Sequence, residues 1–256
     1  MGIEFAESDR AAGEAYLRLA AAVDEFEGYA HPHAARVARL ADALAEQFRL
    51  SRADRASIVF AALLHDIGEL TMKRDYVKRD GPLSDAERLD LARHPVIGEQ
   101  EAARAGADRA VQLLVRWHHE WYGGGGYPDA LRGEQIPLGA RILRVADAYA
   151  ALTDARPWRP AGTEGEARKH LGLWAGIEFD PAVVLAFLSL EGLAELRSFA
   201  REQRRTEEPA AEQQPPAIIR AREERADGDD SGKDEEVVPA AESAARQYPW
   251  DAGTPS

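Results

Sequence analysis

Histidines and acids stand inside otherwise apolar stretches at several separate places in this 256-residue chain. His65 and Asp66 follow the run IVFAALL, and His118 and His119 follow VQLLVRW. Asp147 lies within ILRVADAYAAL. Burying a carboxylate without a partner costs several kcal/mol, so such a group is normally paired or bound to a metal. One polar residue of this kind would be an ordinary core residue, but a set of them indicates a site.

The same set predicts which chemistry the site performs. His33 and His94 complete it, so five of the seven histidines belong to it, and the chain has no cysteine. Imidazole with carboxylate and no thiolate suits iron, manganese or related divalent ions. Neighbouring helical residues point about 100° apart, so adjacent His-Asp and His-His pairs can each serve two ions. Two cations roughly 3.5 to 4 Å apart are suited to hydrolysing phosphate esters.

Composition excludes several other classes of function. The net charge of −13 argues against a binder of nucleic-acid polymers, which needs a basic surface. The N-terminal segment lacks the basic start and apolar run of a signal peptide. No stretch approaches the roughly 18 to 20 uncharged apolar residues of a membrane span. We therefore expect a cytoplasmic protein with no membrane partner.

The elements that must position these residues are predicted to be helices. Val37, Leu40, Leu44 and Phe48 lie on one face of a helical repeat, and Ser84 with Glu87 forms a capping-box pattern. The predicted helices cover residues 33–48, 55–68, 84–94, 95–106, 108–122, 140–155 and 180–199. No segment shows the alternating pattern of a strand. The predicted fold is therefore all-α.

Three parts of the chain differ in composition. Residues 1–20 are expected to form a lead-in helix and residues 21–200 the main domain. Residues 201–256 are acidic, rich in proline and poor in periodic apolar residues, so we predict a disordered tail. The segment PPAIIRAREER in this tail is a candidate helix for a protein partner, although a solvated tail with no dedicated partner is the favoured interpretation.

Six segments in order connect the chain to a known family. They are HPHAARVARLA, LLHDIGEL, ARHPVIGEQ, HHEWYGGGGYPDALRG, IPLGARILRVADAYAALTDARPWRP and GIEFDPAVVLAFL. Over about residues 20 to 190 the chain resembles the HD-GYP family of HD-superfamily metal-dependent phosphohydrolases. The resemblance implies a helical bundle around a dinuclear metal site. It also implies hydrolysis of cyclic di-GMP to pGpG and GMP, as part of bacterial second-messenger signalling.

The resemblance also assigns ligands to two divalent cations, with iron or manganese expected. The first cation would be held by His33, His65, Asp66 and Asp147. The second would be held by Asp66, His94, His118 and His119. Some relatives hold a third metal with a glutamate one turn before the first histidine. That position is Tyr29 in this chain, so we predict two cations.

Further residues are implied to act on the substrate. Asp66 and Glu69 are the candidate catalytic residues. The candidate substrate-binding residues are Arg156, Arg159, Tyr127, Gly124 and Gly126. The two arginines, in the segment RPWR, resemble the basic residues with which the family contacts phosphate, and arginine suits forked contacts to phosphate oxygens. The glycines let the backbone turn close to the metals. Trp121, Tyr122 and Trp158 are equally consistent with stacking on a guanine and with simple packing.

Three positions depart from the family pattern. Glu69 replaces the lysine that usually follows HDIG, Gly123 replaces an acid at the start of the GYP loop, and Ala150 replaces the aspartate of DAL. A carboxylate at position 69 would repel a phosphodiester or contact a metal. Besides the phosphodiesterase, two alternatives therefore stay open: a catalytically degenerate sensor or interaction module, and a phosphohydrolase acting on another nucleotide phosphoester.

Overall fold

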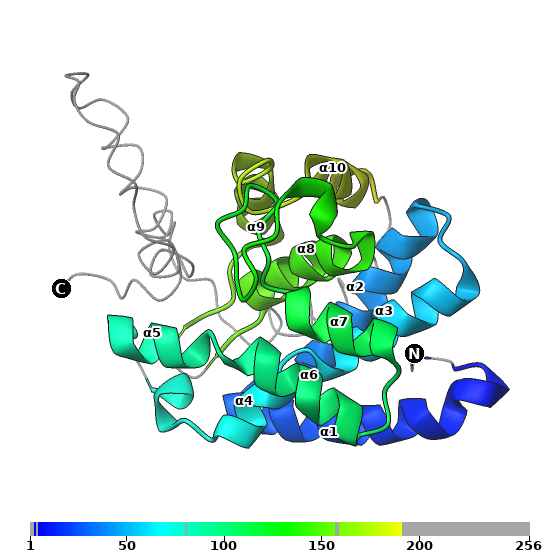
Figure 1. The fold of residues 1–256 in the computed structure, drawn as a ribbon. Helices are drawn as coiled ribbons and strands as arrows, with labels where there is room; N and C mark the ends of the chain where they lie inside the picture. The colour runs from blue at the N-terminus through cyan, green and yellow to red at the C-terminus, as the bar shows by residue number, and fades with distance from the viewer. Residues whose placement is uncertain (1–2, 4, 80, 157–158, 191–256) are drawn as a thin grey trace, which may run out of the picture.

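Helices build the whole described part of the molecule (Figure 1). The computed structural model describes residues 3, 5–79, 81–156 and 159–190. Within these ranges the only β-type pairings are two isolated bridges, Arg156 with Arg159 and Ala175 with Phe179. The all-α prediction is thus confirmed. The tail predicted for residues 201–256 lies outside the described residues.

Ten α-helices follow one another in the described residues, and the longest connection, residues 118–137, joins α7 to α8. They are α1 (Arg10–Glu27), α2 (His33–Gln47), α3 (Arg52–Leu64), α4 (Ile67–Met72), α5 (Asp85–Leu91), α6 (His94–Arg104), α7 (Arg109–Trp117), α8 (Leu138–Thr153), α9 (Glu164–Leu173) and α10 (Pro181–Ser189). A short 3-10 helix, η1 (Glu7–Asp9), precedes α1, and two more, η2 (Asp75–Lys78) and η3 (Gly133–Gln135), lie in the connections α4–α5 and α7–α8.

The core forms where α2 packs against α3 and α8. Val37, Leu40 and Leu44 of α2 are fully buried, as the helical repeat predicts. Helix α8 is buried along most of its length, because α2, α3, α7, α9 and α10 all pack against it. A helix that is apolar nearly all round belongs at the centre of a domain. The carboxylate of Asp147 is therefore carried into the interior.

Helix α1 joins this core as one continuous helix across residue 20. Tyr16, Ala20 and Val23 are buried against the neighbouring helices. The helix ends at Gly28, whose φ of 80° is the left-handed conformation that glycine adopts readily. The chain then turns so that α2 can begin at His33. As a result, the last turn of α1 lies beside α4, where Glu27 is buried.

Several helix boundaries differ from the prediction. The segment 55–68 divides into α3 and α4, because Asp66 leaves helical geometry with φ −102° and ψ 15°. The predicted helix 108–122 ends at Trp117, just before the two histidines. The sequence analysis missed α9, which begins with a capping box formed by Thr163 and Glu166. Within the described ranges, no helix is long and apolar enough to span a membrane.

Candidate metal centre

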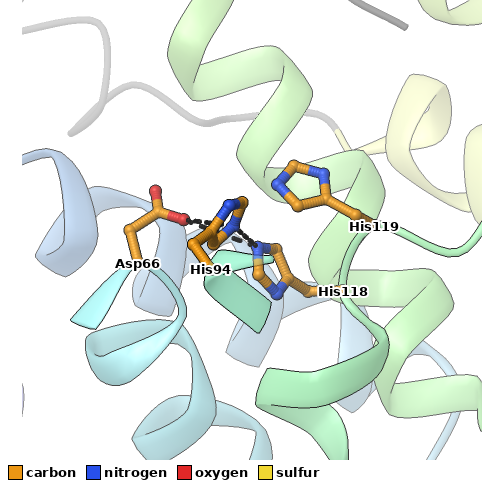
Figure 2. A group of neighbouring side chains, drawn as sticks. All are labelled: Asp66, His94, His118 and His119. Carbon is orange, nitrogen blue, oxygen red and sulfur yellow. Dashed lines mark hydrogen bonds and ion pairs between the residues drawn. The ribbon is translucent and has the colours of Figure 1, made fainter. Parts of the chain in front are cut away.

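The seven predicted ligands come together in two buried groups. One contains His33, His65 and Asp147, and the other contains Asp66, His94, His118 and His119. Within each group the potential ligand atoms all lie within 4.8 Å of one another. Figure 2 shows the second group, which gathers residues from the α3–α4 junction, the start of α6 and the end of α7. His31, the near neighbour of His33, is exposed and lies in neither group.

Asp66 connects the two groups. Its Oδ2 lies 2.8 Å from Nε2 of His65. Its Oδ1 lies 3.3 Å from Nε2 of His94 and 3.5 Å from Nε2 of His118. One carboxylate therefore faces imidazoles of both groups with different oxygens. This is the arrangement expected of a ligand that bridges two cations.

Three of the histidines are oriented in the same way by the backbone. Nδ1 of His65 lies 2.9 Å from the Ala62 carbonyl oxygen. The corresponding distances are 2.8 Å from His94 to Leu91 and 2.7 Å from His118 to Val115. A carbonyl can only accept, so Nδ1 carries the proton and donates it. In the neutral ring, Nε2 is then a free ligand atom directed into the site.

This orientation brings acceptor atoms face to face. The Nε2 atoms of His94 and His118 are 3.3 Å apart, and both face the Asp66 carboxylate. Oδ1 of Asp66 is buried and has no hydrogen-bond partner in the described chain. Converging lone pairs repel unless a proton or a cation lies between them. The donor set therefore fits divalent cations bound by imidazole and carboxylate.

His33 is oriented by a side chain instead. Its Nδ1 donates to Oδ2 of Asp154 at 2.9 Å, and its Nε2 lies 3.4 Å from Oδ1 of Asp147. Asp154 also accepts from the buried Arg36. Burial alone would lower the pKa of His33, but the two carboxylates outweigh it and raise that pKa to about 9. Sequence analysis missed Asp154, although it follows Asp147 by seven residues, two turns of a helix.

His119 has a different environment from the other four. Nη1 of Arg144 lies 3.2 Å from Nδ1 of His119 and 3.2 Å from Oδ2 of Asp147. Arg144 also donates to Glu178, and both side chains are almost completely buried. Because guanidinium only donates, Nδ1 of His119 is an acceptor here. Burial, followed by the charges of His118 and Arg144, holds the pKa of His119 well below its ordinary value.

Electrostatics favour positive charge at the centre of the site. Burial alone would lower the pKa of His65, but the charge and hydrogen bond of Asp66, together with the charges of Asp147 and Glu27, outweigh it and raise that pKa to about 10. For Asp147, burial favours the neutral acid, yet His33, His65 and Arg144 lower its pKa to about 2. The carboxylates thus remain ionised, and protons on the imidazoles balance them. A divalent cation would supply the same positive charge.

The loop after the histidines is held firmly against the site. The backbone N–H groups of Asp129 and Leu131 donate to the two oxygens of Glu120, at 2.6 and 2.9 Å. Tyr127 stacks on His119, with ring centroids 4.9 Å apart. A Cβ on Gly126 would lie 2.2 Å from the backbone nitrogen of Trp121. The two backbone segments approach so closely that only glycine fits at position 126. The candidate residues Gly126 and Tyr127 therefore lie directly beside a predicted ligand.

Glycines 123 and 124 shape the start of the same loop. Gly124 has a φ of +89°, which residues with side chains rarely adopt. A Cβ on Gly123 would lie 2.9 Å from the Ile177 carbonyl oxygen, to which the Gly123 N–H donates. The close backbone contact explains why no acidic side chain stands at position 123. Trp121 is buried edge-on against Trp174, so its ring serves packing.

Comparison with known proteins identifies the family and the fold. The HD domain family matches residues 21–183, about two thirds of the chain and every predicted ligand. This chain belongs to the HD domain family. The structure resembles that of a cyclic GMP-AMP specific phosphodiesterase from Vibrio cholerae, with a TM-score of 0.58 and 21% identity. That match covers 74% of this chain and 50% of the other, and it shows a shared fold.

Curated relatives carry related names. The response regulator RpfG of Xanthomonas campestris, named a cyclic di-GMP phosphodiesterase, is 39% identical over 72% of this chain and 48% of its own length. A Vibrio cholerae protein named 3'3'-cGAMP-specific phosphodiesterase 3 is 36% identical over 54% of this chain and 30% of its own length. This chain thus spans about half of the length of the first relative and less of the length of the second.

The two predicted phosphate-binding arginines lie in the segment that joins α8 to α9. The Arg156 guanidinium donates to Glu27 at 3.2 Å and to the Tyr29 hydroxyl, and it lies over the Tyr29 ring. Arg159 donates to the Ala151 carbonyl. The backbones of Arg156 and Arg159 pair with each other. The structure thus places Arg156 beside the carboxylates of the centre, whereas Arg159 is directed to the backbone.

Proposed function

We propose that this HD domain is a metal-dependent phosphodiesterase that hydrolyses cyclic di-GMP to pGpG and GMP. The observation that carries the proposal is Asp66, whose two oxygens face imidazoles of both ligand groups. Iron or manganese is the proposed metal, because the ligand atoms are imidazole nitrogens and carboxylate oxygens only. The relatives named as cyclic di-GMP phosphodiesterases support the choice of substrate.

The cation ligands and the loop would have different roles in this reaction. Two cations held around Asp66 would activate a water molecule and compensate the charge of the phosphodiester. His33, His65 and Asp147 would hold the first cation, and His94, His118 and His119 the second. The loop of Gly124, Gly126 and Tyr127 would border the substrate. Burial of the centre excludes bulk water and strengthens each of these electrostatic contacts.

Arg156 would bind a phosphate oxygen of the substrate. Its guanidinium already lies at the edge of the ligand groups, in contact with Glu27 and Tyr29. A forked guanidinium can keep one carboxylate contact while a second N–H donates to phosphate. Tyr29 fixes the plane of the guanidinium from one side, because the ring centroid lies 4.1 Å from the Arg156 Cζ. A cytoplasmic setting, where such a messenger would be met, belongs to the same proposal.

The test is anaerobic turnover of cyclic di-GMP by the full chain loaded with Fe(II) or Mn(II). Asp66→Ala should lower kcat/KM by at least about 10³-fold, because cation charge stabilisation of several kcal/mol is lost. Product formation that is equally fast in Asp66→Ala would refute the proposed centre. A parallel assay with 3'3'-cGAMP, the substrate named for other relatives, distinguishes the two cyclic dinucleotides.

A second candidate function is a sensor that binds the cyclic dinucleotide without hydrolysing it. The observation that favours it is Glu69, a buried carboxylate beside the ligand groups where the family usually has lysine. Binding of cyclic di-GMP with no product in the same metal-loaded sample would support the sensor. Rapid turnover would exclude it.

A further inference from the structure

A third group of carboxylates adjoins the two histidine groups. Glu27 from α1, Asp66 from the α3–α4 junction and Glu69 from α4 have oxygens within 4.8 Å of one another. All three side chains are buried. Glu27 stands at the end of a helix that the sequence analysis treated mainly as a lead-in. Glu69 stands where relatives usually have lysine.

Two of these carboxylates have oxygens that lack a hydrogen-bond donor. The Glu69 side chain is only 10% exposed, yet it makes no hydrogen bond within the described chain. Nδ1 of His94 lies 3.9 Å from Oε1 of Glu69, and that nitrogen already donates to Leu91. Oδ1 of Asp66 is also buried without a hydrogen-bond partner. Buried carboxylates of this kind normally bind a proton or a cation.

The nearby side chains do not balance this charge. Arg156 is a single guanidinium, which donates to Glu27 and to the Tyr29 hydroxyl and whose charge also acts on Glu69. Lys73, one turn after Glu69, is exposed at the end of α4. Three buried carboxyl groups thus share one guanidinium, and a bound cation would add compensating positive charge.

We infer that Glu27, Asp66 and Glu69 form a third cation site that takes a hard divalent ion such as Mn²⁺ or Mg²⁺. Its ligands are oxygens only, the set that such ions prefer, whereas the other two groups supply mainly imidazole. The site differs from the glutamate position that Tyr29 occupies. It would raise the number of proposed cations from two to three.

The charge of the site explains how glutamate can stand in place of lysine. A glutamate with a divalent cation carries −1 and +2, a sum of +1, which is the charge of the lysine it replaces. The cation would therefore restore an attraction for phosphate beside Arg156. This consequence rests on the proposed function, whereas the site itself depends only on cation binding.

The test counts cations bound to the full-length protein. The metal-free chain is titrated with Mn²⁺ by calorimetry, and the bound ions per chain are measured by elemental analysis after desalting. We expect three ions for the natural protein and two for Glu69→Gln and for Glu27→Gln. Glu134→Gln, a matched change at an exposed glutamate, should leave three ions bound. Circular dichroism and thermal melting check that each variant is folded.

A count of two for the natural protein, or of three for both site variants, would overturn the inference. Glu69→Lys is a second variant that keeps the test decisive if Glu69→Gln does not fold. The Glu69→Lys variant should bind two ions, and its turnover should not require a third ion. Cation counting is independent of substrate, so the two proposals fail separately. Three ions without product would refute the phosphodiesterase, and product with two ions would refute only the third site.

Discussion

The histidines of the centre fall into two classes according to what orients them. His65, His94 and His118 each donate Nδ1–H to a backbone carbonyl three residues earlier. His33 is oriented by Asp154, which lies 121 residues away in sequence, and His119 contacts Arg144, 25 residues away. In the first class, the local backbone alone presents Nε2 to the site. In the second class, a distant side chain decides which nitrogen is available.

This difference determines how each ligand can be disturbed. A carbonyl cannot be removed by mutation, so the first class should withstand substitutions around it. The second class depends on buried charged partners whose loss leaves another charge uncompensated. Outer partners of metal ligands typically change metal affinity by about 10- to 100-fold. The following substitutions test whether the two classes respond as differently as their contacts suggest.

The largest effect is expected from Arg144→Met. Glu178 would remain fully buried without its guanidinium, and breaking a buried pair in this way costs about 3–5 kcal/mol. Denaturant unfolding of the metal-free chain measures the loss. The double variant Arg144→Met/Glu178→Met should recover most of it, because both charges are then absent. A double variant as unstable as the single one would show that Arg144 stabilises the fold through other contacts.

The same pair of variants tests what Arg144 does to His119. The guanidinium competes for the Nδ1 lone pair, so the double variant should bind the second cation as tightly as the natural protein or more tightly. A tenfold weaker affinity would instead show that Arg144 orients His119 for binding.

A smaller effect is expected from Asp154→Asn. His33 would lose a charged acceptor, and the amide would place a donor group near Arg36. Affinity for the cation of the His33 group should fall about 10- to 100-fold, as measured by competition with a metal chelator. Asp42→Asn is the matched control, since Asp42 pairs with Arg55 away from the centre. Equal affinities in the two variants would contradict the role of Asp154.

The smallest effect is expected from Ser84→Ala. Ser84 caps α5, the helix whose Leu91 carbonyl orients His94. Loss of the cap should cost about 1 kcal/mol of unfolding free energy. Cation affinity should change less than about twofold, because the start of α6 packs against α4 and α7 and holds His94 independently of the cap. A tenfold loss would show that a carbonyl-oriented histidine is as sensitive as His33.

Sequence analysis found the ligands because they interrupt apolar helices, and the resemblance supplied their grouping. The structure brings all seven together, but their assignment as ligands stays a prediction. Glu27 and Arg144 could not be recognised in the same way. Glu27 ends an amphipathic helix whose other glutamates, Glu14 and Glu25, are exposed, and the buried Arg144 pairs with Glu178, which comes 34 residues later. Partners of this kind depend on tertiary packing, which helical periodicity does not record.

Helix breaks were also harder to predict than helices. The run from Arg55 to Gly68 has a continuous apolar pattern, yet Asp66 leaves helical geometry so that its carboxylate can face three histidines. Likewise, α7 ends at Trp117, immediately before the adjacent histidines. In both places the requirements of the centre override local helical preference. Such conflicts between local preference and final structure are expected at functional sites.

Helix α1 connects the metal centre, at Glu27, to a part of the molecule far from it, at Arg10. Its 18 residues form a rod about 27 Å long, and Glu27 is the last of them. A tilt of only about 3° around the far end would move that carboxylate by roughly 1.4 Å, by the same geometry. A displacement of this size is several times the tolerance of a metal–ligand distance, which is about 0.2 Å. A contact that tilts the first turns of α1 could therefore displace the Glu27 carboxylate without touching any histidine.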